Sequence, residues 1–233
     1  MSGPALRFAA NPDEVYRVAR LPDPWQWTPW QYAPFNGRWD DSHGTYRVIY
    51  TAASTYACFV EVLAQFRPDP STLALMAEVE DDERDVLYPT IAAGAVTQQW
   101  VSQRAVGSAW LTGQHVDVGA FDTLAWLRPR IASLLTRHGI ADLDGAVIRD
   151  AQARPFTCDL SHWLYELSTT GDPISGVDFE SRHGNDLLLW ATFERNHDGP
   201  VSQRLTRRDH HAMSVDDPAF LDAMQLHGLH LVD

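Results

Sequence analysis

The stretch FNGRWDDSHGTYRVIYTAASTYACFVEVLAQF, residues 35–66, carries the strongest local signals in the chain. Residues 47–52 alternate in a way that predicts a short β-strand. Ser54 or Thr55 then caps a helix that we expect to continue for about ten residues. Glu61 lies in this helix among apolar neighbours, and a buried carboxylate is unfavourable unless a partner compensates it. The stretch therefore predicts a strand followed by a helix with one unusual acidic residue.

Strand and helix signals are mixed along the rest of the chain, without regular alternation. Strands are predicted at 71–80, 116–119, 144–150, 174–181 and 186–194. Helices are predicted at 97–111, 121–139 and 157–168. Within 121–139, Pro129 is expected to open a second helix and Gly139 to end it. The tail is predicted to form a helix between Pro218 and Gly228, followed by a final extended piece. Residues 1–36, rich in proline and tryptophan, are predicted to be irregular and to pack through their aromatic side chains.

This order of elements predicts an α+β fold with mixed, largely antiparallel sheets and flanking helices. The turn RHGN, residues 182–185, joins two predicted strands and is too short to connect parallel ones. No repeat or long linker divides the chain, so we expect a single domain over residues 1–233. The sequences GxGxxG and GxxxxGK[ST] are absent, which argues against a Rossmann or P-loop nucleotide site.

Charge and composition exclude several classes of function. The formal net charge is −13, and such an acidic surface disfavours direct binding to nucleic acid. All 18 basic residues are arginine, so no mechanism that uses a lysine amine is open to this chain. No apolar run is long enough for a membrane span and no signal peptide is evident, and we expect a cytoplasmic protein.

Cysteine and histidine patterns do not predict a metal site. Cys58 and Cys158 are far apart and are expected to be reduced core residues. The ten histidines lack HExxH or CxxC spacing, so we expect surface or packing roles for them, and His43 is read as a solvated loop residue.

Three functional side chains come from consecutive elements of the opening stretch. Arg38 follows a glycine in the loop, Tyr50 is in the strand, and Glu61 is in the helix. They could converge on one cleft. The alternative is structural: a buried ion pair between Arg38 and Glu61, with Tyr50 as a packing aromatic.

The motifs that decide between these readings resemble the RES-domain family, which is named for an arginine, a glutamate and a serine. The resemblance rests on GRW at 37–39, Gly44, YTA at 50–52, EV at 61–62 and the run ISGVDFESRHGNDLLLWATFE at 174–194. Arg38, Glu61 and Ser181 fall on the three named positions. It covers about residues 15–195 and leaves 196–233 as a C-terminal helical extension. Asp40 departs from the asparagine that the family often has after GRW.

The resemblance implies a fold similar to the ADP-ribosyltransferases and a toxin that consumes NAD. It also implies a cognate antitoxin with a helix-turn-helix region. Some members of the family cleave NAD at the nicotinamide–ribose bond with phosphate as acceptor, and others attach ADP-ribose to a protein, so phosphate, water and a protein side chain all stay open as acceptors. A non-catalytic binding module with the same fold is a third possibility. NAD is expected as a substrate, with phosphate as a possible co-substrate and no separate cofactor.

The expected roles follow from the chemistry of NAD cleavage. Glu61 would stabilise the positive charge that develops on the ribose, or hold its hydroxyls. Arg38 would bind the two phosphates through its planar guanidinium group. Tyr50 would stack on nicotinamide or orient the ribose, and Ser181 would hydrogen-bond a phosphate or the carboxamide. Arg182 and Asn185, in the turn after Ser181, are further candidates for substrate binding.

Overall fold

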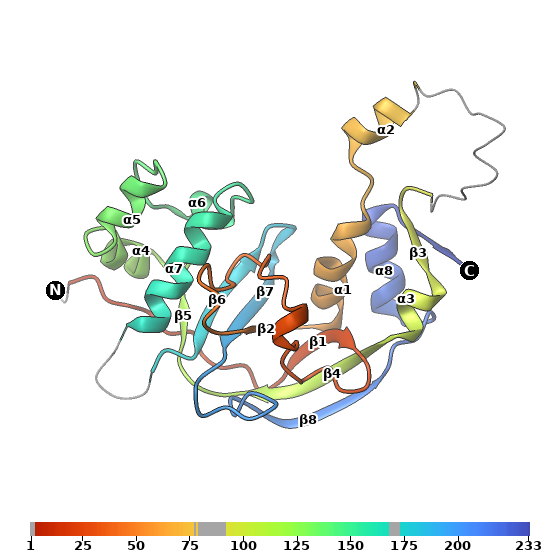
Figure 1. Ribbon diagram of the computed structural model, residues 1–233, viewed down its shortest axis with the longest axis horizontal. Helices are drawn as coiled ribbons and strands as arrows, with labels where there is room; N and C mark the ends of the chain where they lie inside the picture. Colours follow the sequence, from red (N-terminus) through yellow and green to blue (C-terminus); the bar gives the residue numbers. More distant parts are fainter. Residues whose placement is uncertain (1–2, 77, 79–91, 168–172) are drawn as a thin grey trace.

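A seven-stranded sheet forms the centre of the protein in a computed structural model, which describes residues 3–76, 78, 92–167 and 173–233 (Figure 1). The strand order is β5-β6-β7-β2-β1-β4-β8, and every neighbouring pair is antiparallel except β5 and β6. The prediction of an α+β fold with a largely antiparallel sheet is therefore confirmed. The strands are β1 (Val15–Arg20), β2 (Val48–Ala52), β4 (Arg104–Leu111), β5 (His115–Asp117), β6 (Gly176–Ser181), β7 (Gly184–Phe193) and β8 (Leu205–Ala212).

The sheet is nearly split between β1 and β2. Their ladder has one pair, Tyr16 with Ala52, whereas β1 pairs with β4 at six positions and β2 pairs with β7 at five. The two strands therefore separate along most of their length. This separation opens the cleft described below.

A second, two-stranded sheet joins the C-terminal end of the chain to its middle. β3 (Ala95–Thr97) pairs in parallel with β9 (His230–Val232). β9 follows the last helix, which ends at Gly228 in the left-handed conformation expected of a glycine there. The final extended piece predicted from the sequence is thus a strand.

The helices form two groups (Figure 1). α4 to α7 lie near β5 and β6, while α1 packs against β1 and β2 in the middle of the sheet and against α8, where the Phe59 and Phe220 rings meet edge to face with their centres 5.6 Å apart. Among the helices of the described residues, none is long and apolar enough to cross a membrane. The helices are α1 (Thr55–Leu63), α2 (Pro70–Met76), α3 (Gln98–Ser102), α4 (Phe121–Leu127), α5 (Ala132–Arg137), α6 (Gly145–Arg149), α7 (Arg154–Glu166) and α8 (Pro218–His227), with 3₁₀ turns η1 (Trp30–Tyr32) and η2 (Ala64–Phe66).

Tryptophans from the N-terminal segment cover part of the sheet, as the sequence predicted. Trp25 and Trp27 are buried and pack with Trp190 of β7 in a core separate from the main one. Gly107 of β4 makes this packing possible, because a Cβ at that position would lie 2.7 Å from the Trp25 ring. The same segment nevertheless contains β1, so the prediction that all of residues 1–36 are irregular was wrong.

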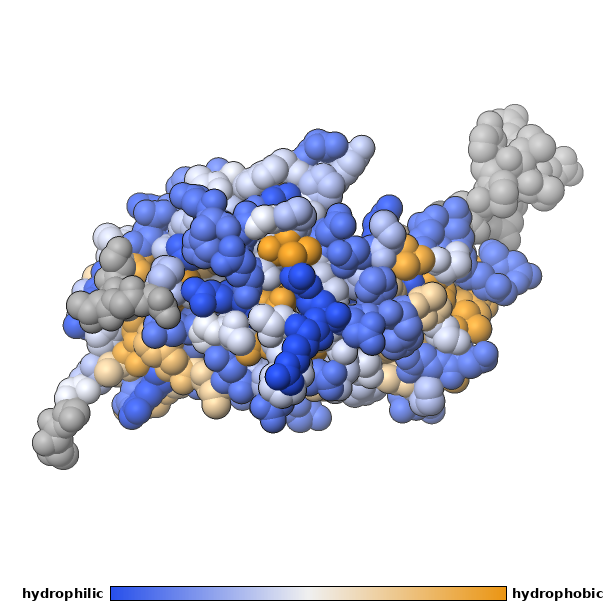
Figure 2. All heavy atoms as spheres, turned by 90° about the horizontal axis from the view of Figure 1, so that it is seen from below, coloured by the Kyte–Doolittle hydropathy of each residue, from blue (hydrophilic) through white to orange (hydrophobic). Residues whose placement is uncertain are grey.

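The outer edge strand β8 was also missed, and its side chains are mostly exposed. Its sequence LTRRDHHA is polar and charged, which discourages pairing with another sheet edge. Figure 2, seen from below, shows a surface dominated by hydrophilic residues on this side of the molecule. Because β8 belongs to the large sheet, residues 196–233 are not the helical extension that we expected.

Three further element predictions are corrected. Residues 97–111 form the short helix α3 and then β4, because the second half pairs with both β1 and β8. Residues 144–150 form α6 instead of a strand, since the Asp144 carboxylate caps the amide of Val147 at 2.9 Å. Within 71–80, α2 replaces the start of the predicted strand and most of the remainder lies outside the described residues.

The segment after α4 is interrupted where the proline was expected to open a helix. α4 ends at Leu127 and α5 begins at Ala132, so Pro129 lies in the turn between them. Gly139 follows α5 with a φ of +66°, as a helix-ending glycine should. The predicted strand at 47–52, the helix after Ser54 and the hairpin around the RHGN turn are confirmed.

Candidate active site

The gap between β1 and β2 opens into a cleft of about 840 Å³. Arg17 and Val18 of β1 line one part of it, and Tyr50 of β2 lines another. Glu61 of α1 and the loop around Arg38 complete the wall. A cleft of this volume has the size of ordinary small-molecule sites in proteins.

Tyr50 holds the loop that carries Arg38. Its hydroxyl accepts the Trp39 amide at 2.9 Å and donates to Asp40 Oδ1 at 2.9 Å. The other Asp40 oxygen accepts the Gly37 amide at 2.7 Å. Gly37 must be glycine, since a Cβ there would lie 2.4 Å from the Tyr50 hydroxyl oxygen. The Tyr50 hydroxyl is thus engaged by the loop before any ligand binds.

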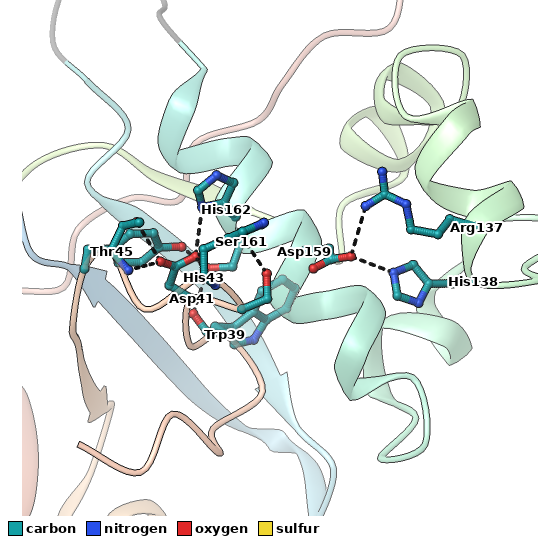
Figure 3. A network of polar contacts seen from close by, with 11 residues as sticks. Trp39, Asp41, His43, Thr45, Arg137, His138, Asp159, Ser161 and His162 are labelled. Carbon is teal, nitrogen blue, oxygen red and sulfur yellow. Dashed lines mark hydrogen bonds and ion pairs between the residues drawn. The ribbon is translucent and has the colours of Figure 1, made fainter. Parts of the chain in front are cut away.

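Helix α7 holds the same loop from the other side. The Thr157 hydroxyl donates to the Arg38 carbonyl at 2.7 Å. The Ser161 hydroxyl donates to the Trp39 carbonyl at 2.7 Å (Figure 3). Thr157 and Ser161 are fully buried, so these bonds are shielded from water. The backbone on both sides of Arg38 is therefore fixed by side chains from β2 and α7.

Asp41 organises the far end of this loop (Figure 3). Its carboxylate accepts the Thr45 amide and hydroxyl, the His43 amide at 3.2 Å and His162 Nδ1 at 2.8 Å. Burial opposes ionisation of Asp41, but these hydrogen bonds outweigh it and lower the carboxyl pKa. Side-chain atoms of Asp41, His43 and His162 lie within 4.8 Å of one another, a spacing that a metal ion could also use. With its donors already present, the carboxylate needs no metal to account for its burial.

Glu61 is oriented by Ser181, the serine of the three motif positions. The Ser181 hydroxyl donates to Glu61 Oε1, and it accepts the His183 amide at 2.9 Å. Ser181 is fully buried and does not line the cleft, whereas Glu61 does. Ser181 therefore reaches a ligand only through Glu61, and it positions the carboxylate.

Two guanidinium groups line the cleft with nitrogens that have no hydrogen-bond partner among the described residues. These are Nη1 of Arg38 and both Nε and Nη1 of Arg17, all of them buried. Burial lowers the pKa of Arg17 to about 10, although Cys58 and Asp23 oppose the shift, and the group stays protonated at neutral pH. Burial also lowers the pKa of Arg38, with Glu61 opposing it. An oxyanion in the cleft would satisfy these donors, each of which otherwise costs about 1–3 kcal/mol.

Arg38 and Glu61 do not form the buried ion pair that the structural alternative required. Both residues are described, and no nitrogen–oxygen contact within 4.0 Å joins them. The Arg38 guanidinium lies 5.8 Å from the centre of the Phe179 ring instead. The two charged groups therefore line one cleft without a direct ion pair between them.

Comparison with known protein families identifies the family of this chain. The sequence model of the RES domain matches residues 14–204. The chain belongs to the RES-domain family. Among solved structures, this RES domain is similar to a chain of the crystal structure of the M. tuberculosis MbcT-MbcA toxin-antitoxin complex, with 14% identity and a TM-score of 0.46 over 93% of this chain and 89% of that chain. No curated protein matches the sequence.

Four of the six residues singled out in the sequence line the cleft of this RES domain. They are Arg38, Tyr50, Glu61 and Arg182. Ser181 lies directly behind Glu61. Asn185 is not among the lining residues; it is exposed on β7, where Arg149 approaches its side-chain oxygen at 3.5 Å.

Arg17 and Arg154 are cleft residues of the RES domain that the sequence reading missed. Arg154 begins α7 and donates to the Asn36 carbonyl at 3.0 Å. The run VYRVAR at 15–20 is a short β-like pattern that could have drawn attention to Arg17, but the surrounding prolines and tryptophans obscured it. With both included, the described residues that line the cleft contain four arginines and two carboxylates, Asp40 and Glu61. The cleft is thus basic in a protein whose net charge is −13.

Proposed function

We propose that this RES-domain protein is a toxin of a toxin–antitoxin pair that cleaves the nicotinamide–ribose bond of NAD. One cleft combines two guanidinium groups, whose buried nitrogens lack a partner in the described part of the chain, with a carboxylate that a buried serine orients, and this observation carries the proposal. Arg17 and Arg38 supply donors for a pyrophosphate, which needs several of them at fixed positions. Glu61 supplies the single negative charge that a developing ribosyl cation needs.

The reaction can be written with these groups alone. The bond between ribose C1′ and the nicotinamide nitrogen breaks with its electron pair going to nitrogen, so the leaving nicotinamide is neutral. The positive charge moves from the pyridinium ring to the ribose as an oxocarbenium ion. Glu61 stabilises that ion, and Ser181 restricts the carboxylate to one orientation. The acceptor, phosphate or water, then forms the new bond at C1′ and loses a proton to solvent.

The test is product analysis after incubation of the purified protein with NAD. We expect free nicotinamide by chromatography, and a strong dependence on phosphate if phosphate is the acceptor. Release at the same rate without phosphate identifies water. Labelled ADP-ribose on protein would favour the transferase reading, and intact NAD after long incubation would favour a non-catalytic binding module.

We also propose that a cognate antitoxin with a helix-turn-helix region silences this protein. The support is family membership, together with a cleft that is basic and open to a covering partner. Expression of the chain alone should arrest bacterial growth, and co-expression of the neighbouring gene product should restore it. Normal growth with high levels of folded protein would contradict the toxin assignment.

A further inference from the structure

A second cavity, of about 430 Å³, adjoins the cleft, and Arg182 lines both. Its other lining residues are Arg67, His183, Leu226 and His227. They come from three separate parts of the chain: the segment after η2, the turn between β6 and β7, and the end of α8. The cavity is therefore assembled only by the tertiary fold.

His183 lies between the two arginines of this cavity. Arg67 Nη2 is 3.4 Å from one ring nitrogen, and Arg182 Nε is 3.4 Å from the other. Burial lowers the pKa of His183 to about 4, and both arginines add to the shift, so the ring is neutral near pH 7. A neutral imidazole accepts at one nitrogen and carries hydrogen on the other. It can therefore accept a hydrogen bond from only one of the two arginines.

The two guanidinium charges have no compensating carboxylate within the described part of the chain. Neither Arg67 nor Arg182 takes part in an ion pair there, and the cavity wall contains no acidic residue. His227 does not supply an acceptor through Nε2, which is 2.8 Å from the Val60 carbonyl. Because both guanidinium groups line the same cavity, an anion bound in that cavity would offset their mutual repulsion.

We propose that Arg67 and Arg182 form a subsite for a phosphate-type oxyanion at the edge of the cleft. Two guanidinium groups provide paired N–H donors that match phosphate oxygens. The anion is either a free phosphate ion or a phosphate group of the nucleotide in the cleft. Its position beside a nucleotide rests on the proposed function, whereas its binding by the two arginines does not.

Calorimetric titration of inorganic phosphate at constant ionic strength tests the subsite, with wild-type protein, Arg67→Gln and Arg20→Gln. Arg67 is chosen because it does not line the cleft. Arg20→Gln is the matched control, since it also removes one arginine, at an exposed position at the end of β1. Removing a charge-assisted contact should weaken phosphate binding about tenfold or more in Arg67→Gln. Arg20→Gln should bind within about twofold of wild type, because exposed charges away from a site are screened.

A parallel titration with NAD in phosphate-free buffer distinguishes the two sources of the anion. Weaker phosphate binding alone in Arg67→Gln assigns the subsite to a free ion, and weaker NAD binding assigns it to a nucleotide phosphate. Unchanged affinity for both ligands in Arg67→Gln overturns the proposal, as does an equal loss in Arg20→Gln. If wild-type protein fails to release nicotinamide while Arg67 still controls phosphate binding, the proposed function fails and the subsite stands.

Discussion

Replacing Glu61 with glutamine separates a chemical role for this carboxylate from a structural one. The carboxylate accepts the Ser181 hydroxyl and makes no ion pair with Arg38. Glutamine keeps an oxygen that can accept the Ser181 hydroxyl and loses only the charge. The hydrogen bond from Ser181 is therefore weaker in the variant, because it is no longer charge-assisted. The expected loss of stability is about 1 kcal/mol. For a chain of this size, that corresponds to a fall in Tm of about 2–4 °C.

The effect on NAD cleavage should be much larger than the effect on stability. A group that stabilises charge only in the transition state commonly contributes about 100- to 1,000-fold to the rate. Nicotinamide release and Tm should be measured on one preparation of Glu61→Gln. Glu180→Gln is the matched control, because Glu180 pairs with Arg149 at the surface and does not line the cleft. It should retain full activity.

Two results would refute this reasoning. A fall in Tm beyond about 10 °C would indicate a loss of about 3–5 kcal/mol, which is the size expected when a buried ion pair is broken. Glu61 would then be a structural residue. Nicotinamide release within about threefold of wild type, in a protein of normal Tm, would remove Glu61 from the chemistry.

Four further predictions concern the cleft and its surroundings. Arg38→Lys should fail to restore NAD binding in calorimetry, because an ammonium group lacks the planar fork of donors; wild-type affinity would make Arg38 structural. Arg17→Met should weaken NAD binding about tenfold, whereas Tm should stay level or rise. The reason is that the change removes two buried nitrogens without a partner among the described residues. Unchanged NAD affinity would count against a role of Arg17 in ligand binding. Tyr50→Phe should lower the free energy of unfolding in urea by about 1–3 kcal/mol, because Asp40 and the Trp39 amide each lose a hydrogen-bond partner. An unchanged free energy of unfolding would show that the Tyr50 hydroxyl does not hold the loop. Burial, with nearby carboxylates, raises the pKa of Asp178 to about 7, so this group's contribution to stability is greatest below about pH 4 and is lost as pH rises to about 7. Asp178→Asn should therefore gain up to about 4 kcal/mol over wild type between pH 4 and pH 8 in urea unfolding, and a pH-independent difference would refute the shift.

Local signals in the sequence were sufficient where an element depends on its own residues. The Ser54 cap and the apolar run after it predicted α1, and Ser54 does accept the Ala57 amide at 3.1 Å. The RHGN turn predicted the β6–β7 hairpin, because a turn of this length can join only antiparallel strands. Arg38 and Glu61 could likewise be named in advance as candidates for one cleft, because they come from consecutive elements, and the resemblance to the RES-domain family decided for the cleft over an ion pair.

Long-range pairing decided the elements that the sequence misplaced. Residues 104–111 carry no clear alternation, yet they form β4 because β1 and β8 supply hydrogen-bond partners on both sides. Residues 205–212 form an edge strand with mostly exposed side chains, so their sequence is polar and shows no alternation of hydrophobic and polar residues. Strand propensity depends on neighbouring strands, and these neighbours are far away in the chain.

The cleft itself was decided by tertiary structure alone. It exists because β1 and β2 share a single ladder pair and then separate, and no local pattern in either strand encodes that separation. The separation brings Arg17 to face the same space as Arg38 and Glu61, from a segment that had seemed irregular. Ser181 behaves in the same way: its place in the sequence suggested contact with a ligand, but the fold buries it behind Glu61. Residue types determined which chemical groups this chain has available, whereas the geometry of strand pairing decided which of them line the cleft, because only the folded sheet sets their distances.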